Sequence, residues 1–129
     1  MGVGTIDLYH LHRPDPMVPI EESVGALAEL RQAGKIGEIG VSNVDLIQLC
    51  AAERVAPITS AQNRFSLFDQ AGRDVLDHCT ADGIAFLAYS PLRGVPSPAL
   101  ARVLGATAEA HQVTTAHIAL AWLLASPPW

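Results

Sequence analysis

Small polar side chains follow four apolar segments of this 129-residue sequence. Imidazole, hydroxyl and amide groups can donate and accept hydrogen bonds, so a set of them can hold and orient a polar organic ligand. In parallel α/β folds the ligand site lies at the carboxyl ends of the strands, where such groups would meet. Taken singly, each group also has a simpler interpretation as a helix cap, a turn residue or a partner for loop backbone. The groups are His10 and His12, Ser42 and Asn43, Gln62 and Asn63, and Tyr89 and Ser90.

The pair His10 and His12 could also bind a metal ion, because residues two apart lie on the same side of a strand. A metal-dependent hydrolase of the barrel type would use such a pair. The other strand ends offer hydroxyl and amide groups, which are poor zinc ligands. Cys50, Cys79 and His78 fall on expected helices, away from this edge. We therefore expect no metal site, and the hydrolase interpretation has the least support.

Four short β-rich runs alternate with segments of helical period, and the runs begin 31, 22 and 26 residues apart. This spacing is typical of βαβ units and a parallel sheet. The expected strands are Thr5–His12, Ile36–Val41, Ile58–Gln62 and Ile84–Tyr89. The expected helices are Glu21–Ala33, Val44–Arg54 with Ser42 or Asn43 as its N-cap, Asp69–Asp82, Pro98–Ala110 after Ser97, and one from Thr114 or Thr115 through Ala125. A doubly wound sheet or part of a (β/α)₈ barrel fits this order, whereas a complete barrel needs about 250 residues.

The composition excludes several classes of protein. Half of the residues are hydrophobic and 16% are charged, which is typical of a folded domain rather than a disordered chain. The net charge of −5, with a single lysine, argues against nucleic-acid binding because there is no basic stripe. The longest apolar run, Ile118–Ala125, has eight residues, too few for a membrane span. Two cysteines make no disulfide framework and no signal peptide is evident, so we expect a cytoplasmic protein.

Five collinear blocks resemble the aldo-keto reductase family, and together they span essentially the whole chain. The blocks are Asp7–Pro16, Gly34–Asn43, Ala61–Asn63 with Phe65–Leu67, Ala88–Leu92, and Ala119–Leu124. The resemblance implies a partial (β/α)₈ barrel whose four strands are strands four to seven of the family fold. Residues 1–129 would then be one reductase domain truncated at both ends, since the sequence opens almost directly into a strand and closes on Pro127, Pro128 and Trp129.

The resemblance also implies roles for the polar strand ends. His12 would be the active-site histidine that orients the carbonyl of a small-molecule substrate. Ser42, Asn43 and Gln62 would hold the nicotinamide carboxamide, and Tyr89 would stack on the nicotinamide ring. Amide and hydroxyl groups suit a carboxamide, and a flat aromatic ring suits a flat cofactor ring. The cofactor expected from the family is NADPH, with NADH as the alternative.

The segment after the fourth strand would follow the cofactor pyrophosphate, with Ser90 and Leu92 along its path and Arg93 near a phosphate. The family's general acid, a tyrosine activated by a lysine and an aspartate, lies on strands that precede this segment. Tyr9 and Lys35 are not those residues, because Tyr9 faces away from His12 and Lys35 lies in a helix-to-strand turn.

The resemblance implies that the full-length parent would reduce aldehydes or ketones with NADPH, while this chain alone would be inactive. A non-catalytic, NADPH-binding or regulatory relative of the reductases is the alternative. Four strands without barrel closure leave open edges and apolar surface, so we expect the isolated chain to self-associate.

Overall fold

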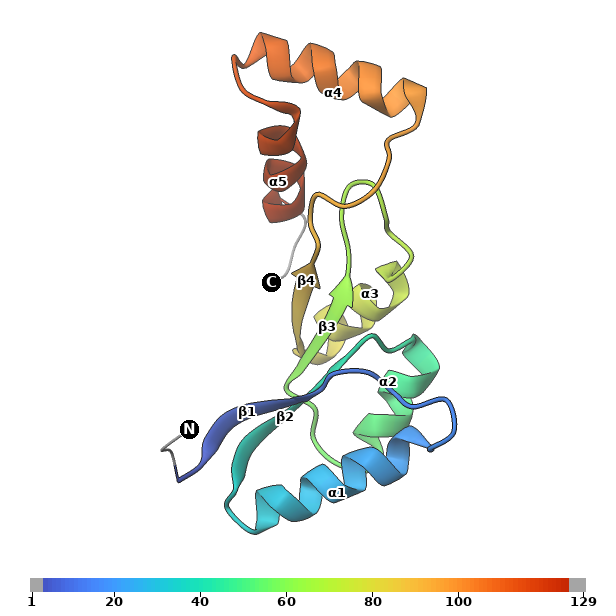
Figure 1. Cartoon of the computed structure of the whole chain (residues 1–129), viewed down its shortest axis with the longest axis vertical. Coiled ribbons are helices and arrows are strands. Elements are labelled where there is room, and N and C mark those ends of the chain that lie inside the picture. Colours follow the sequence, from blue (N-terminus) through green and yellow to red (C-terminus); the bar gives the residue numbers. More distant parts are fainter. Residues whose placement is uncertain (1–3, 126–129) are drawn as a thin grey trace.

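The computed structural model describes residues 4–125, which form one sheet of four parallel strands in the order β1-β2-β3-β4. Each strand is followed by helical structure, so consecutive strands are neighbours joined by crossover helices (Figure 1). The strands are β1 (Ile6–Leu11), β2 (Ile36–Ser42), β3 (Ser60–Arg64) and β4 (Ala85–Tyr89). The helices are α1 (Ile20–Gln32), α2 (Leu46–Glu53), α3 (Arg73–Asp82), α4 (Pro98–Ala110) and α5 (Thr115–Ala125).

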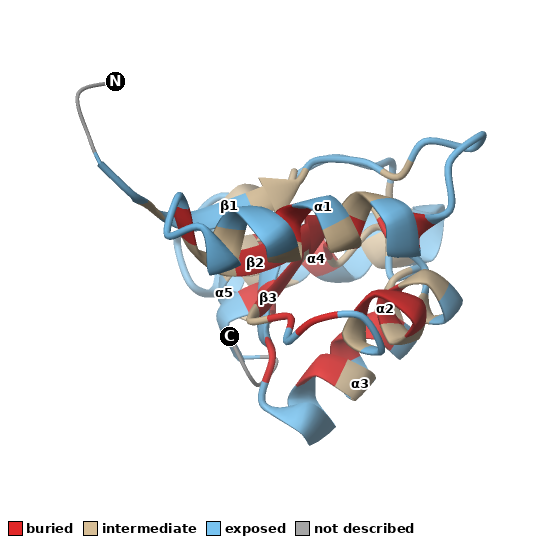
Figure 2. Cartoon of the chain, turned by 90° about the horizontal axis from the view of Figure 1, so that it is seen from below, coloured by how far each residue is buried: buried red, intermediate tan, exposed pale blue. Residues whose placement is uncertain are grey.

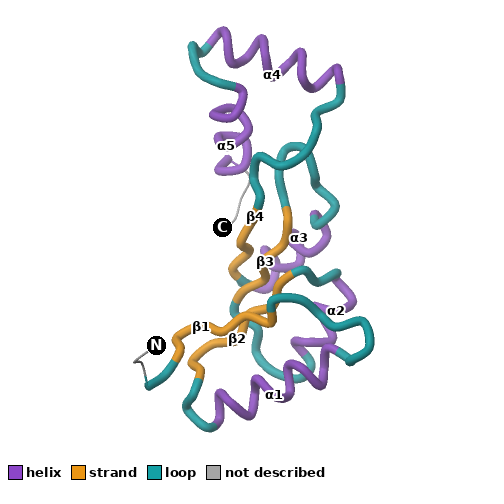
Figure 3. Tube along the Cα trace, viewed as in Figure 1, coloured by secondary structure: helices purple, strands orange, loops and turns teal. Residues whose placement is uncertain are grey.

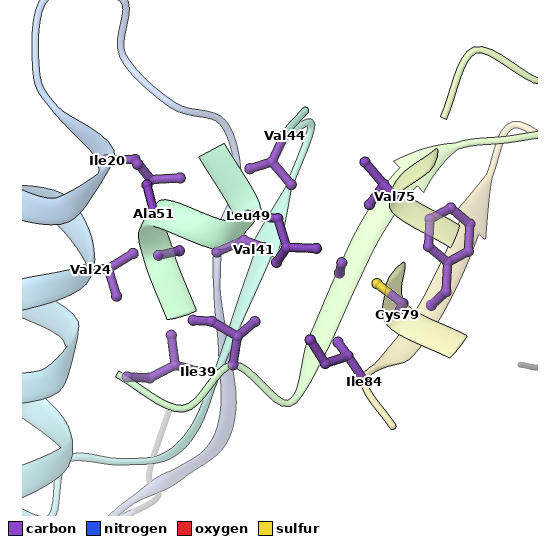
Figure 4. Packing of buried hydrophobic residues seen from close by; sticks show 14 of the residues in the cluster. Ile20, Val24, Ile39, Val41, Val44, Leu49, Ala51, Val75, Cys79 and Ile84 are labelled. Atoms are coloured by element: carbon purple, nitrogen blue, oxygen red, sulfur yellow. The ribbon is translucent and has the colours of Figure 1, made fainter. Parts of the chain in front are cut away.

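Helices α1, α2 and α3 cover one face of the sheet, and the hydrophobic core lies between them and the strands. Ile39 and Val41, alternate residues of β2, are fully buried against this helix layer, where they meet Val24 of α1 and Leu49 of α2 (Figure 4). Buried residues concentrate where the helices meet the sheet (Figure 2). Cys79 of α3 lies in the same core, where burial and the nearby Glu53 carboxylate raise the pKa of its thiol to about 11.

The opposite face of the sheet is lined by small and polar side chains near its middle and by apolar side chains beyond them. His10, Gly40 and Ser60 lie side by side across β1, β2 and β3. Leu8 of β1 and Leu87 of β4, on this face, are 43% and 38% exposed. An apolar surface of this kind is typical of a sheet that packs against further structure.

The starts of two helices and one strand differ from the sequence predictions. Helix α2 is capped by Asp45, whose carboxylate accepts from the Gln48 backbone N–H at 2.8 Å, so the prediction of Ser42 or Asn43 as the N-cap was wrong. Helix α3 begins at Arg73, not Asp69, because the backbone groups of Ser66 and Asp69 pair in a turn.

The third strand begins at Ser60 rather than Ile58, since its ladder with β2 starts where Ser60 faces Gly40. The other elements lie within two residues of their predicted bounds, and Ser97 caps α4 as expected, its hydroxyl accepting from the Leu100 N–H. Within residues 4–125, every helix falls short of the length and apolar character that crossing a bilayer demands.

Two residues of α2 give a matched test of this core. Leu49 is fully buried, while Ile47, two positions earlier, is 81% exposed. Leu49→Ala should lower the free energy of unfolding by about 2–5 kcal/mol, because it removes buried methyl groups and leaves a cavity. Ile47→Ala should change it by less than about 0.5 kcal/mol. Urea unfolding followed by circular dichroism measures both, and equal losses would contradict the helix orientation described.

Candidate functional site

The carboxyl ends of all four strands meet at a depression with a volume of about 290 Å³. The carboxyl ends of the strands are where the chain leaves the sheet and continues into loops that lead to the helices (Figure 3). Six of the eight residues predicted for the site line the depression, together with two arginines that sequence reasoning did not select. The lining residues are His12, Arg13, Ser42, Asn43, Gln62, Arg64, Tyr89 and Arg93.

Asn43 connects the ends of all four strands. Its side-chain nitrogen Nδ2 donates to the carbonyl of His12 at 2.8 Å and to Oγ of Ser42 at 3.1 Å. Its Oδ1 accepts from the hydroxyl of Tyr89 at 2.5 Å, and its backbone N–H donates to the carbonyl of Gln62 at 3.0 Å. The backbone of Asn43 has a φ of 58°, a left-handed conformation that asparagine tolerates better than most residues.

This network limits which groups are available to a ligand. Both hydrogens of the Asn43 amide are used inside the protein, and one lone pair of Oδ1 remains. Ser42 is 1% exposed, and its hydroxyl donates to the carbonyl of Gln62 at 2.8 Å. The Gln62 side-chain amide, by contrast, lines the depression and has no hydrogen-bond partner among residues 4–125. Gln62 is therefore the amide that is open to a bound molecule.

Asn63, the residue after Gln62, holds the loop that follows β2. Its side chain is buried, accepts from the Val44 N–H at 3.1 Å and donates to the Val44 carbonyl at 2.7 Å. The structure therefore confirms the interpretation of Asn63 as a partner for loop backbone. Asn63 faces the helix layer, so it positions the site without lining it.

His10 and His12 have different surroundings although they lie two residues apart. Nε2 of His10 is 2.7 Å from Oγ of Ser60, and its ring lies over Gly40. A Cβ on Gly40 would come within 1.8 Å of that ring, which explains why glycine occupies the position. His12 is exposed at the rim of the depression. Only His12 therefore faces a ligand, and His10 packs within the sheet face.

The depression is locally basic in an acidic protein. Arg13, Arg64 and Arg93 line it, although the chain has a net charge of −5. Arg64 also contacts Asp69, with 3.6 Å between Nη1 and Oδ2, and its side chain stays 48% exposed. Guanidinium groups match the geometry of phosphate oxygens, so this set suits a phosphorylated ligand. The sequence does hold a signal that could have placed Arg13 and Arg64 in the site, because they directly follow His12 and Asn63 at the strand ends.

Ser90 and Leu92 do not join this depression. Ser90 has a φ of 54° and its carbonyl accepts from the Arg93 N–H at 3.0 Å, so it forms the turn that presents Arg93. Leu92 lines a second cavity of about 300 Å³, together with Phe68, Gly94 and Leu104. This more apolar cavity lies between the segment after β4 and helices α4 and α5.

Comparison with known proteins places the chain in a family. The sequence model of the aldo/keto reductase family matches residues 1–128. An uncharacterized oxidoreductase of Schizosaccharomyces pombe is 37% identical over 131 residues, covering 99% of this chain and 42% of that protein. Pyridoxine 4-dehydrogenase of Escherichia coli is 36% identical over 109 residues, covering 84% of this chain and 38% of that protein.

Solved structures give the same result. A thermostable aldo-keto reductase in complex with the inhibitor epalrestat superposes with a TM-score of 0.85 at 38% identity, covering 96% of this chain and 47% of its own. An aldo/keto reductase from Klebsiella pneumoniae, in complex with NADP and acetate, superposes with a TM-score of 0.78 at 30% identity, covering 96% and 46%.

The parallel sheet, its helix layer and the polar depression at the strand ends define part of a (β/α)₈ barrel. The chain belongs to the aldo/keto reductase family of oxidoreductases. It spans less than half of the length of the relatives named here.

The contact between His10 and Gly40 gives a prediction with a built-in control. Gly40→Ala should lower the free energy of unfolding by about 1–3 kcal/mol, because the new methyl group displaces the His10 ring from Ser60. Gly25→Ala, in α1 with no atom within 4 Å of the added Cβ, should raise it by about 0.5–1 kcal/mol. Urea unfolding measures both changes, and a Gly40→Ala variant as stable as the native chain would refute the packing described.

Proposed function

We propose that this chain forms the nicotinamide-binding part of an NADPH-dependent oxidoreductase that reduces aldehydes or ketones to alcohols. The observation that carries the proposal is the meeting of Tyr89, Gln62 and three arginines at one edge of an aldo/keto reductase barrel. Relatives with NADP or NADPH bound support the choice of cofactor. The reduced nicotinamide, when bound, supplies a hydride.

In this proposal, the residues of the chain bind the cofactor and fix its orientation. The Tyr89 hydroxyl is held by Asn43, so its ring offers a fixed flat surface for a nicotinamide. Gln62 donates to and accepts from the carboxamide, and Arg13, Arg64 and Arg93 bind phosphate oxygens. The hydrogen bonds of Ser42 and Asn43 fix Gln62 and Tyr89, and the contact of Ser42 and Asn43 with the carboxamide itself stays a prediction.

His12 is the group proposed to orient the substrate carbonyl. It is exposed at the rim of the depression, and its backbone carbonyl is held by Nδ2 of Asn43. An imidazole N–H can donate to a carbonyl oxygen and so fix the face that it presents to the cofactor.

The 129-residue chain alone is proposed to lack turnover. Its two tyrosines are Tyr9, on the side of β1 away from His10, and Tyr89, whose hydroxyl donates to Asn43. Its single lysine, Lys35, lies between α1 and β2, at the amino end of the sheet. A positioned general acid contributes about 10²–10⁴-fold to a rate, so its absence removes most of the catalysis.

Cofactor binding and turnover can be tested separately. The chain should quench or shift the fluorescence of added NADPH, while NADPH oxidation with a panel of aldehydes stays at the level of a control without protein. Gln62→Ala should weaken NADPH binding by about three- to tenfold, the equivalent of one or two hydrogen bonds. Gln32→Ala, at the far end of α1, should not change it.

Two results would contradict these proposals. NADPH binding that is equally strong in Gln62→Ala would remove the carboxamide role. Steady aldehyde-dependent oxidation by the chain alone would show that it carries its own general acid, and would overturn the proposed inactivity.

The isolated chain is also proposed to self-associate, because Leu8 and Leu87 are exposed on the sheet face opposite the helix layer and β1 and β4 are edge strands. Light scattering at micromolar concentration should show a mass above 13.7 kDa. A monodisperse monomer would contradict this expectation.

A further inference from the structure

A second polar cluster lies between helices α2 and α3, at the end of the sheet opposite the depression. Cys50 and Glu53 lie three residues apart on α2, and His78 and Asp82 lie four apart on α3. These spacings place each pair on one face of its helix. The two helices pack side by side (Figures 1 and 2), so the two pairs face each other.

The side chains of this cluster converge on the His78 ring. Nε2 of His78 is 2.8 Å from Oε2 of Glu53 and 3.2 Å from Oδ2 of Asp82. Sγ of Cys50, a carboxylate oxygen of Glu53 and a ring nitrogen of His78 all lie within 4.8 Å of one another. The side chains of His78 and Glu53 are 24% and 26% exposed, so the cluster is half-buried but open to solvent.

The electrostatics at this place favour a cation. Glu53 and Asp82 are the last residues of α2 and α3, where the helix dipole is negative and a carboxylate is unfavourable. Neither helix has a basic residue in its last turn. Arg54, the next residue after α2, pairs with Glu21 of α1 at 3.7 Å. Two carboxylates and two helix ends therefore concentrate negative charge around one imidazole.

The identity of the ligands points to a zinc-like ion. Thiolate, imidazole and carboxylate are the groups that bind Zn²⁺, at metal–ligand distances of about 2.0–2.3 Å. A tetrahedron with such bonds has ligand atoms about 3.3–3.8 Å apart. To reach it, the 2.8 Å contact between His78 and Glu53 would open slightly, and small side-chain rotations would bring Cys50, Glu53 and His78, now within 4.8 Å of one another, to this spacing. An ion pair between His78 and the two carboxylates accounts for three of the groups but gives no role to Cys50.

We propose that Cys50, Glu53 and His78 form a binding site for a divalent transition metal of the zinc type, which ties α2 to α3, with the Asp82 carboxylate beside the His78 ring. The site uses none of the residues that line the strand-end depression, so it is independent of the proposed oxidoreductase function. Binding of this ion stabilises the folded chain, because the unfolded chain does not hold ligands 28 residues apart in place.

Cobalt(II) is the probe, because a thiolate ligand gives it a strong near-ultraviolet charge-transfer absorption that oxygen and nitrogen ligands do not. The 129-residue chain, without a histidine tag, should bind one equivalent of Co²⁺ with this absorption, and Zn²⁺ should displace it. Cys50→Ser should abolish the absorption, and His78→Ala should weaken Co²⁺ binding at least tenfold. Cys79→Ala, which removes the other and buried cysteine, should retain the spectrum.

Unfolding provides a second readout that does not depend on the spectrum. Zn²⁺ should raise the urea midpoint of the native chain and of His111→Ala, a variant of an exposed histidine at the end of α4. It should not raise the midpoint of Cys50→Ser or His78→Ala, each compared with the same variant without metal. The proposal is overturned if the native chain shows neither effect, or if Cys50→Ser keeps the charge-transfer absorption.

Discussion

The amide of Asn43 is the interaction on which the strand-end site depends. Parallel strands pair along their length, but nothing in the ladder itself fixes the residues that follow the last pair. Here one side chain reaches the ends of β1, β2 and β4, and its backbone N–H reaches β3. Asparagine suits the position twice, because it accepts a φ of 58° and its amide both donates and accepts.

Fixing the strand ends separates the polar residues into two kinds. One kind forms its hydrogen bonds within the protein, namely Ser42, Asn43 and Asn63. The other kind has hydrogen-bonding groups that face the depression, namely Gln62, His12 and the arginines. The first group holds the second, so a ligand need not order these loops when it binds. Such preorganisation lowers the entropic cost of binding. The site is therefore best understood as a rigid frame with a few open hydrogen-bonding groups.

The order of elements and the meeting of His12, Asn43, Gln62 and Tyr89 could be predicted, because parallel βαβ units bring strand ends to one edge. What could not be predicted is which polar groups are already engaged. Ser42 and Asn43 look like helix caps or ligand donors in the sequence, yet Asp45 caps the helix and both side chains bond within the site. Cys50 and His78 look like ordinary helical residues in the sequence, and only the packing of α2 against α3 brings them together.

Helix α2 is held at both ends by groups from neighbouring elements, and it runs from one polar cluster to the other. At its start, the Asn63 side chain forms hydrogen bonds with the backbone N–H and carbonyl of Val44, the residue directly before the Asp45 cap. At its end, Glu53 contacts His78 of α3. The helix between them buries Leu49 in the core shared with β2 and β3, so packing as well as both ends fixes its position. An ion bound between α2 and α3 would therefore act on the site as a brace, stabilising the helix that leads from Asn43 without touching any residue that faces the ligand.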